Sequence, residues 1–230
     1  ILLINVHATD NAGDAALLDM ALVALREALP GSRVTIAMNA SDPRYDRPEE
    51  GAVVAPSFIA VTQPVGPATT LRRVLALLWG GGQALFAALF WRLFRRLPPL
   101  PDRGLCGLLA QYAASDLVVS CPGNIFASTG KAGLPVLLSA VTVAIGAAMG
   151  KPLYVLPQSV GPLTKGWQRR LVGRLYRGAR VVMVREPVSL RFAQFLDIPA
   201  ARLHLVPDLA YAYPAAGERD VAPALLTRVS

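Results

Sequence analysis

Glycine and polar residues cluster directly after several apolar runs of the sequence, and their types suit the binding of a small anion. Glycine lets the backbone approach a bound group, while serine, asparagine and glutamine side chains offer hydrogen bonds. An arginine among them could hold a carboxylate or a phosphate through two parallel hydrogen bonds. The candidate site residues are Asn11, Gly13, Asp14, Gly123, Asn124, Gln158, Ser159, Gly161, Arg185, Ser189 and Asp208.

The stretch from Lys151 to Arg185 indicates how such residues would be positioned. An apolar strand at 152–156 breaks into the polar segment 157–163, and a basic helix and a second strand follow. Unbroken apolar runs are typical of buried parallel strands, and open parallel sheets bind ligands at the edge where their strands end. The helix start would point free N–H groups at an anion, but a plain strand-to-helix connection favours the same Gly and Pro residues.

The rest of the chain repeats this alternation, which predicts an α/β fold. We expect a doubly wound, mostly parallel, Rossmann-like sheet over residues 1–213, with the polar turns at one edge. The expected strands are 1–6, 33–38, 52–55, 58–62, 116–120, 152–156, 181–184 and 204–206. Three of the main expected helices span 105–114, 134–149 and 166–178. Two others are expected to end at Pro30 and at Leu196.

Composition and charge narrow the classes of partner. The 230 residues include 23 Lys and Arg against 15 Asp and Glu, a net charge of +8 concentrated at 72–103 and 165–191. This favours a phosphorylated ligand or an acidic lipid surface. Nucleic acid is not expected, because the basic runs lack interleaved aromatics and carry no recognised binding motif. Cys106 and Cys121 have no metal-ligand spacing, so we expect no metal and a reducing, cytoplasmic compartment.

An apolar segment with basic ends interrupts the alternation at 70–103. No charge occurs from Val74 to Trp91, three glycines lie in the middle, and arginines flank both ends. The length is at the lower limit for a membrane span, and each Gly weakens a helix by about 1 kcal/mol relative to Ala, so a span is not expected. Two interpretations stay open: a helix that covers the sheet, and a helical excursion that lies on an anionic membrane surface.

The order of the polar motifs resembles the polysaccharide pyruvyl transferase family. That family has an Asn-x-Gly-Asp turn, a Gly-rich turn after an Asp-Leu-Val-type strand, a Gln-x-x-Gly-Pro-Leu turn, an Arg-(Asp/Glu)-x-x-Ser element and a later strand ending in Asp. The corresponding positions here are 11–14, 121–124, 158–163, 185–189 and 208. The resemblance extends over residues 1–213.

The resemblance implies a two-domain, GT-B-like architecture of which residues 1–213 are the first half. Residues 214–230 would be a linker or the start of a second domain that completes the site, so the isolated domain is expected to be inactive. The implied enzyme transfers a pyruvyl group from phosphoenolpyruvate to a pair of sugar hydroxyls and forms a ketal. The acceptor would be a polysaccharide or a lipid-linked precursor in cell-envelope biosynthesis, at the inner face of the membrane. No other cofactor is implied.

The resemblance also implies roles for the candidate residues. Arg185 would bind the donor and Asp14 would serve the proton steps, although Arg185 could instead pair with Glu186 or Asp208, and Asp14 could cap its helix. The polar residues Asn11, Asn124, Gln158, Ser159, Ser189 and Asp208 would orient substrate, and Gly13, Gly123 and Gly161 would let backbone approach it.

One turn departs from the family pattern, and two other functional classes stay open. Residues 121–124 keep a single Gly and add Pro122, which removes an N–H donor. A GT-B-type glycosyltransferase would use a nucleotide sugar in place of phosphoenolpyruvate. A non-catalytic domain would dock a membrane or a partner through 70–103.

Overall fold

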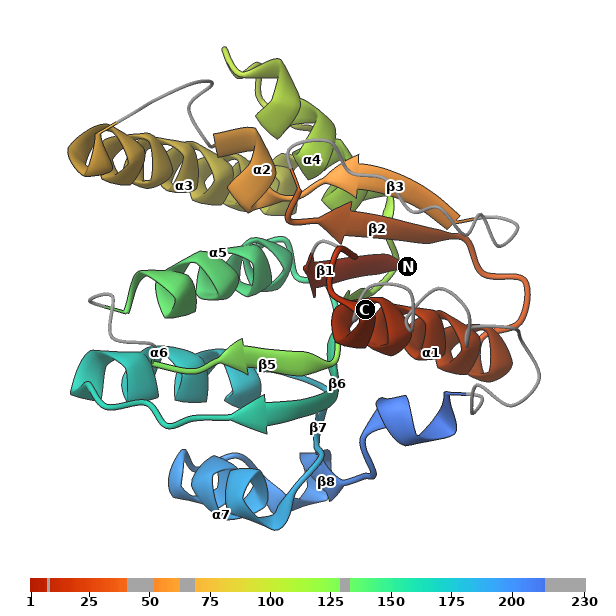
Figure 1. Cartoon of the computed structure of the whole chain (residues 1–230). Coiled ribbons are helices and arrows are strands. Elements are labelled where there is room, and N and C mark those ends of the chain that lie inside the picture. The colour runs from red at the N-terminus through yellow and green to blue at the C-terminus, as the bar shows by residue number, and fades with distance from the viewer. Residues whose placement is uncertain (8, 41–51, 63–68, 129–132, 214–230) are drawn as a thin grey trace, which may run out of the picture.

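A single parallel sheet organises the chain (Figure 1). The computed structural model describes residues 1–7, 9–40, 52–62, 69–128 and 133–213. Within these described residues, eight strands lie in the order β3-β2-β1-β4-β6-β7-β8, with β5 also paired to β6. They are β1 Leu2–Val6, β2 Val34–Met38, β3 Ala52–Pro56, β4 Val118–Ser120, β5 Gly123–Phe126, β6 Leu153–Val160, β7 Val181–Val184 and β8 Leu203–Leu205. The predicted Rossmann-like α/β class is confirmed.

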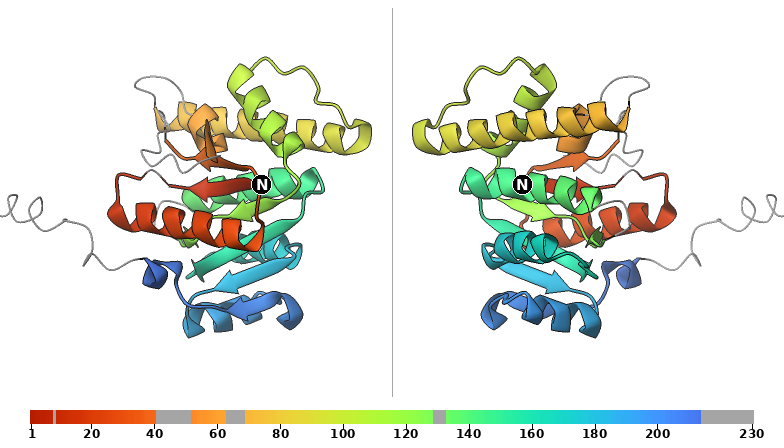
Figure 2. Two further views of the ribbon diagram at one scale, coloured as in Figure 1. Left: turned by 90° about the vertical axis from the view of Figure 1, so that its right-hand side faces the viewer. Right: turned by 90° about the vertical axis from the view of Figure 1, so that its left-hand side faces the viewer.

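Helices cover both faces of the sheet, as a doubly wound fold requires (Figure 2). Strand residues alternate between two apolar clusters: Leu2 and Ile4 face one, and Leu3 faces the other. Helix α1 packs with the smaller cluster, and the other helices pack with the larger one. The helices are α1 Ala12–Ala28, α2 Phe58–Thr62, α3 Thr70–Phe94, α4 Arg103–Ala114, α5 Leu134–Ala148, α6 Gly166–Arg177 and α7 Pro187–Phe195.

Strand β6 is longer than expected, because it continues through Pro157 to Val160. Its pairing with β7 is irregular between Val155 and Gln158, and proline is tolerated in strands at such bulges because no ladder hydrogen bond is lost there. The prediction that the strand ends at Leu156 is therefore wrong, and Gln158 and Ser159 lie in the strand itself.

The turn expected at 121–124 is the junction between two strand segments. Strand β4 pairs with the first part of β6, up to Ser120 opposite Val155, and β5 pairs with the second part, beginning with Gly123 opposite Gln158. Gly123 and Asn124 therefore belong to β5 and not to a turn. Pro122 lies at the junction, where its missing N–H disturbs neither segment.

The strand expected at 58–62 is the short helix α2. The hydroxyl of Ser57 accepts a hydrogen bond from the backbone N–H of Ala60, and the Thr62 hydroxyl donates to the Phe58 carbonyl, so local side-chain bonds favour the helical turn. A run of five apolar residues does not by itself distinguish the two structures. Residues 214–230, expected as a linker or domain start, lie outside the described residues.

The apolar excursion forms the continuous 25-residue helix α3 despite its three glycines. The Thr69 hydroxyl caps it by accepting from the N–H of Arg72. Helix α3 contacts α2, α4 and α5. Its buried Ala84, Ala87 and Ala88 belong to the larger apolar cluster, which also contains sheet residues such as Leu2 and Ile4.

Candidate functional site

Ser159, Arg185 and Asp208 meet where β6, β7 and β8 end. The Arg185 Nε donates a hydrogen bond to the Ser159 Oγ over 2.7 Å, and its Nη1 lies 2.6 Å from Oδ2 of Asp208. The Asp208 Oδ1 accepts from the N–H of Ala210, which fixes the carboxylate. About a fifth of the Arg185 and Asp208 side chains is exposed, so a ligand could reach both. Among the described residues, no group bonds the Nη2 of Arg185.

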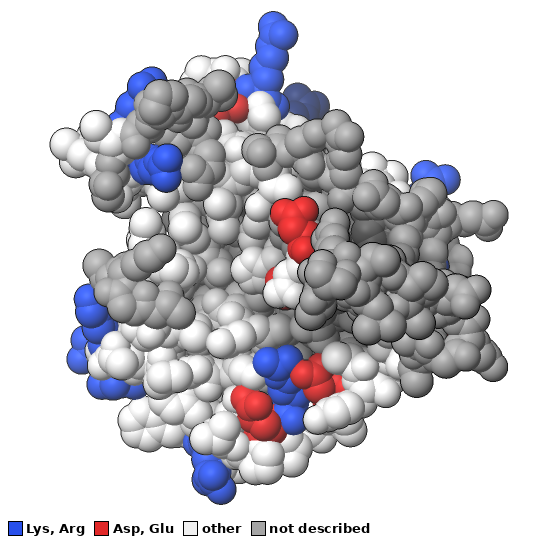
Figure 3. All heavy atoms as spheres, viewed as in Figure 1, with Lys and Arg blue, Asp and Glu red and all other residues white. Residues whose placement is uncertain are grey.

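Glu186 and Ser189 extend this cluster at the start of α7. The Ser189 hydroxyl accepts from the N–H of Val160 and donates to Oε1 of Glu186 over 2.7 Å, so the buried serine ties α7 to β6. Hydrogen bonds from Ser159 and Ser189, and the Arg185 charge to a smaller extent, hold the pKa of the Glu186 carboxyl below its usual range. Figure 3 shows basic and acidic side chains side by side near the ends of β7 and β8.

A second group of candidates surrounds the start of α1. Asn11 is the helix cap, since its Oδ1 accepts from the N–H of Gly13 over 3.0 Å. Asp14, in the first turn, is therefore not needed as a cap, and it is partly exposed. Burial, and to a smaller extent the charge of Asp14, raises the pKa of the Cys121 thiol just beyond β4.

A buried chain of polar side chains lies beneath both groups. The Gln158 Nε2 donates to the Ser120 hydroxyl over 2.8 Å and to the Cys121 carbonyl over 2.6 Å, and its Oε1 accepts from the Tyr176 hydroxyl over 2.6 Å. Asn5 continues the chain, because its Nδ2 donates to Ser120 and its Oδ1 accepts from Thr142 over 2.7 Å. Gln158 is wholly buried, so it supports the edge from below and contacts no ligand.

This chain includes four residues that sequence reasoning did not select: Asn5, Ser120, Thr142 and Tyr176. Asn5 carried a detectable signal, since a polar residue interrupts the apolar run Leu2–Val6. It adopts a left-handed φ of 60° where the β1–β2 register shifts, a conformation that asparagine tolerates better than most residues. Thr142 and Tyr176 lie on helices. Their positions in the sequence give no indication that they contact Asn5 and Gln158 on the strands.

The remaining candidates lie on β5 and just beyond β6. Asn124 is exposed, while Gly123 and Gly161 have φ values of 132° and 89°, which non-glycine residues rarely adopt. A Cβ atom on Gly161 would also lie 3.0 Å from the Phe192 ring. Gly161 therefore lets the end of β6 pass close to α7, a packing role that accounts for it without a ligand.

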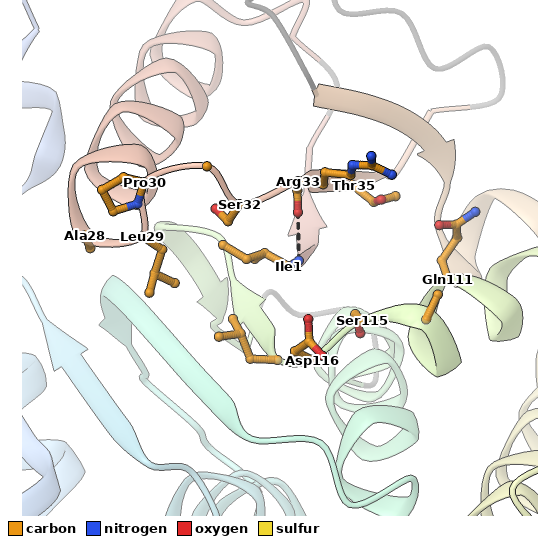
Figure 4. A pocket seen from close by; sticks show the side chains of 13 residues that line it. Ile1, Ala28, Leu29, Pro30, Ser32, Arg33, Thr35, Gln111, Ser115 and Asp116 are labelled. Carbon is orange, nitrogen blue, oxygen red and sulfur yellow. Dashed lines mark hydrogen bonds between the residues drawn. The ribbon is translucent and has the colours of Figure 1, made fainter.

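A large cavity occurs at the opposite edge of the sheet. It has a volume of about 830 Å³ and is lined by residues that precede the strands, among them Arg33 and Asp116 (Figure 4). The amino group of Ile1 donates to the Arg33 carbonyl there. None of the candidate site residues lines this cavity. The candidate residues therefore lie away from this cavity, at the carboxyl edge of the sheet.

Charge limits what this edge can bind. Arg185 is a cation, whereas Asp14, Glu186 and Asp208 are anions, so the two groups together are net negative. Carboxylates, hydroxyls and amides of this kind suit the hydroxyls of a neutral polyol, and a single partly exposed guanidinium suits one anionic group. Within the described part of the chain, no group of three or more His, Cys, Asp or Glu side chains could hold a metal ion.

A comparison with known protein families identifies a match over most of the chain. The family model of polysaccharide pyruvyl transferases matches residues 11–224, which contain all of the candidate residues. No curated protein and no solved structure matches the chain.

Proposed function

Because this chain belongs to the polysaccharide pyruvyl transferase family, we propose that it transfers the pyruvyl group of phosphoenolpyruvate to two hydroxyls of a saccharide. The observation that carries this proposal is the meeting of Ser159, Arg185 and Asp208 at the sheet edge inside the matched region. Parallel sheets bind their ligands at this edge.

The reaction defines what the residues must do. The donor's methylene carbon gains a proton, two sugar oxygens bond to the adjacent carbon, and the bond from that carbon to the phosphate oxygen breaks. The sugar hydroxyls lose two protons. The equivalent of one is added to the methylene carbon, which becomes a methyl group, and the other leaves with the phosphate. A carboxyl group suits these proton steps, and Asp14 is our candidate because Asn11 already caps α1 and leaves its carboxylate available.

The donor and the acceptor would occupy different parts of the edge. Strands β1 and β7 are three strand spacings apart in the sheet order, about 14 Å at the backbone. Phosphoenolpyruvate is too small to reach both ends of that distance. The Nη2 of Arg185 would therefore hold one anionic group of the donor, and the acceptor hydroxyls would lie toward Asn124 and Asp14.

The net negative charge of this edge supports the same division. Arg185 alone does not neutralise a donor that carries both a phosphate and a carboxylate, so further cations must complete the donor site. The family's two-domain architecture would supply them from a second, facing domain. Ser159, Asn124 and the carboxylates would mainly serve the saccharide.

The test is phosphate release by the whole natural protein. We expect release only when phosphoenolpyruvate and a saccharide with a suitable hydroxyl pair are both present, and none from a nucleotide sugar. Arg185→Gln should raise the KM for phosphoenolpyruvate about 30-fold, the equivalent of about 2 kcal/mol for a charged hydrogen bond. Asp14→Asn should lower kcat about 100-fold or more.

Arg180→Gln is the matched control for Arg185. Arg180 is exposed and precedes β7, whereas Arg185 follows it, so the two variants remove the same charge from opposite edges. Equal effects of the two variants on the KM would contradict the placement of the donor. Release of a nucleotide from a nucleotide sugar in place of phosphate from phosphoenolpyruvate would contradict the reaction.

A further inference from the structure

Helix α3 points its large apolar side chains outward. Those between Leu71 and Leu93 are spaced three or four residues apart, with Gly82 in the same series, and form one stripe along the helix. Leu71, Leu75, Leu78, Phe86, Leu89 and Leu93 are each between 53% and 76% exposed, and Trp79 beside them is 70% exposed. A contiguous apolar surface of this kind is unusual on a soluble protein and marks a site of interaction.

The fully buried positions of α3 are occupied by small residues, although Leu77 and Trp91 also pack partly against the core. Ala84, Ala87 and Ala88 are buried, and a Cβ atom on Gly80 would lie 2.6 Å from the Thr62 side chain. Small residues let α3 lie close against its neighbours, and this reverses the usual arrangement of a surface helix, which buries its large apolar residues. The outward stripe is therefore not an accidental by-product of packing.

Helix α3 is fixed flat against the rest of the protein. The amino group of Lys151 lies 4.5 Å from the centre of the Trp91 ring, which attaches the end of the helix to the start of β6. Residues Leu71–Phe94 are long and apolar enough to cross a membrane, but a third of the most apolar window is buried. Figures 1 and 2 show the helix lying along the periphery of the molecule. These contacts fit a helix α3 that lies parallel to a membrane surface. They do not fit a helix that spans the membrane.

The charges on α3 and on the segments that flank it in sequence are all of one sign. No Asp or Glu occurs from Gly51 to Pro101, while Arg72 and Arg73 lie at one end of the helix and Arg92, Arg95 and Arg96 at the other. All five arginines are exposed. An apolar stripe between basic ends matches a surface that is apolar below and anionic at its boundary.

We propose that the outer face of α3 docks the protein onto an anionic lipid bilayer, with the helix axis parallel to the membrane plane. The apolar stripe would enter the boundary between headgroups and acyl chains, and the arginines would contact lipid phosphates. A second copy of the chain fits less well. Antiparallel pairing of two α3 helices would place Arg72 against Arg92, parallel pairing would place each arginine against itself, and no nearby carboxylate in 51–101 would compensate.

Vesicle flotation of the 230-residue chain tests this proposal. We expect the chain to float with vesicles of phosphatidylcholine containing roughly 30% phosphatidylglycerol, and only weakly with phosphatidylcholine alone. The emission of Trp79 should shift to shorter wavelength with the anionic vesicles, and a Trp79→Phe variant should lose that shift while still floating. Leu75→Ser combined with Leu89→Ser should reduce binding about tenfold or more.

Two matched controls separate the apolar and the electrostatic contributions. Val188→Ser with Phe195→Ser removes exposed apolar side chains from α7 and should leave flotation unchanged. Arg72→Gln with Arg92→Gln should weaken binding to the anionic vesicles about 30-fold, as expected for two lost charges at roughly 1 kcal/mol each. Arg174→Gln with Arg191→Gln lowers the net charge equally, at exposed positions on α6 and α7, and should leave binding unchanged.

Three results would overturn the proposal. The first is an absence of flotation by a chain whose circular dichroism spectrum shows that it is folded. The second is equal loss of binding in the α3 and the control variants, since net charge alone would then explain it. The third is a dimer in sedimentation that Leu75→Ser with Leu89→Ser converts to monomer, because the stripe would then be an interface between copies. None of these results depends on whether pyruvyl transfer is detected.

Discussion

Arg185 and Glu186 are adjacent in sequence and have different tasks at the residue scale. Arg185 shares its guanidinium between the Ser159 hydroxyl and the Asp208 carboxylate, which fixes its plane before a ligand arrives. Glu186 accepts a hydrogen bond from Ser189 over 2.7 Å, and the Ser159 hydroxyl also lowers the pKa of its carboxyl. Ser159 therefore connects the Arg185 guanidinium to the Glu186 carboxylate. We expect a substitution of Arg185 to change the pKa of Glu186.

Glu186 makes stability depend on pH. Its pKa is lowered in the folded protein from the ordinary value of 4.5, so ionisation stabilises the fold above that value, and the stabilisation is lost as the pH falls through the lower, folded-state pKa. We expect the difference in the free energy of unfolding between wild type and Glu186→Gln to be constant above about pH 5.5 and to shrink below about pH 4.5. Urea unfolding at a series of pH values measures it.

The control for this prediction is Ser159→Ala. It removes the larger of the two hydrogen bonds that lower the Glu186 pKa and leaves the carboxyl in place. The pH dependence of stability should be reduced but not abolished. If wild type and Glu186→Gln lose stability in parallel down to pH 3, the hydrogen bonds of Glu186 do not act as described.

At the scale of elements, the polar chain through Gln158 holds three strands and two helices in register. Asn5, Ser120 and Gln158 come from β1, β4 and β6, while Thr142 and Tyr176 come from α5 and α6. Burial raises the pKa of Tyr176, so its hydroxyl stays protonated and donates to Gln158. The elements that present the candidate site residues are therefore linked beneath the surface.

Breaking this chain should destabilise the protein strongly. Gln158→Ala leaves the Cys121 carbonyl and the Tyr176 hydroxyl without a partner, and creates a cavity, so we expect a loss of about 3 kcal/mol in the free energy of unfolding. Tyr176→Phe should cost about 1.5 kcal/mol, because Gln158 Oε1 is then left unpaired. Urea unfolding of the wild type, the two single variants and the double variant gives the four free energies of a double-mutant cycle.

The double variant decides whether the two side chains act together. A loss smaller than the sum of the single losses by about 1 kcal/mol is expected for residues that share a hydrogen bond. Strict additivity would contradict the arrangement. Tyr112→Phe is the matched control, since Tyr112 is equally buried but donates to the Thr142 carbonyl and does not contact Gln158.

At the scale of the whole molecule, the candidate site lies at the carboxyl edge of the sheet, and the apolar stripe lies on the peripheral helix α3. Cys121 lies inside this body, where burial, and to a smaller extent the charge of Asp14, raises the pKa of its thiol. Cys106 is partly exposed on α4. The reactivity of Cys106 should therefore report its local exposure in the folded protein. The reactivity of Cys121 should report opening of the whole sheet.

Thiol titration of the folded protein with an aromatic disulfide reagent checks this expectation. About one thiol should react rapidly, and the second only under conditions that unfold the chain. Cys106→Ser should abolish the rapid reaction, whereas Cys121→Ser should keep it. Rapid reaction of Cys121 in the folded protein would show that the junction between β4 and β5 opens without unfolding of the sheet.

Much of the fold could be predicted from sequence, because the signals involved are local. Apolar runs such as Leu153–Val155 and the spacing of Leu18, Leu22 and Leu25 depend only on near neighbours, so most strands and helices were confirmed where expected. The polar residues after these runs predicted one shared edge, since strands that are all parallel end on the same side. The resemblance in motif order was confirmed by the family match.

Several features depended on tertiary contacts. Gln158 was expected in a polar turn where it would orient substrate, and only its three partners on other elements make its burial favourable. Strand β5 and the second half of β6 form because each pairs with the other, and neither has a distinctive pattern alone. Asn11 and not Asp14 caps α1, a choice that depends on backbone geometry.

The sequence by itself determined the class of fold, the family and the set of polar residues at the strand ends, because these follow from residue type and local order. The tertiary structure decided which of those residues meet, which are buried as support, and which face of α3 is exposed. The physical reason is that hydrogen bonding and burial are properties of pairs of residues distant in sequence, and only the packed chain brings those pairs together.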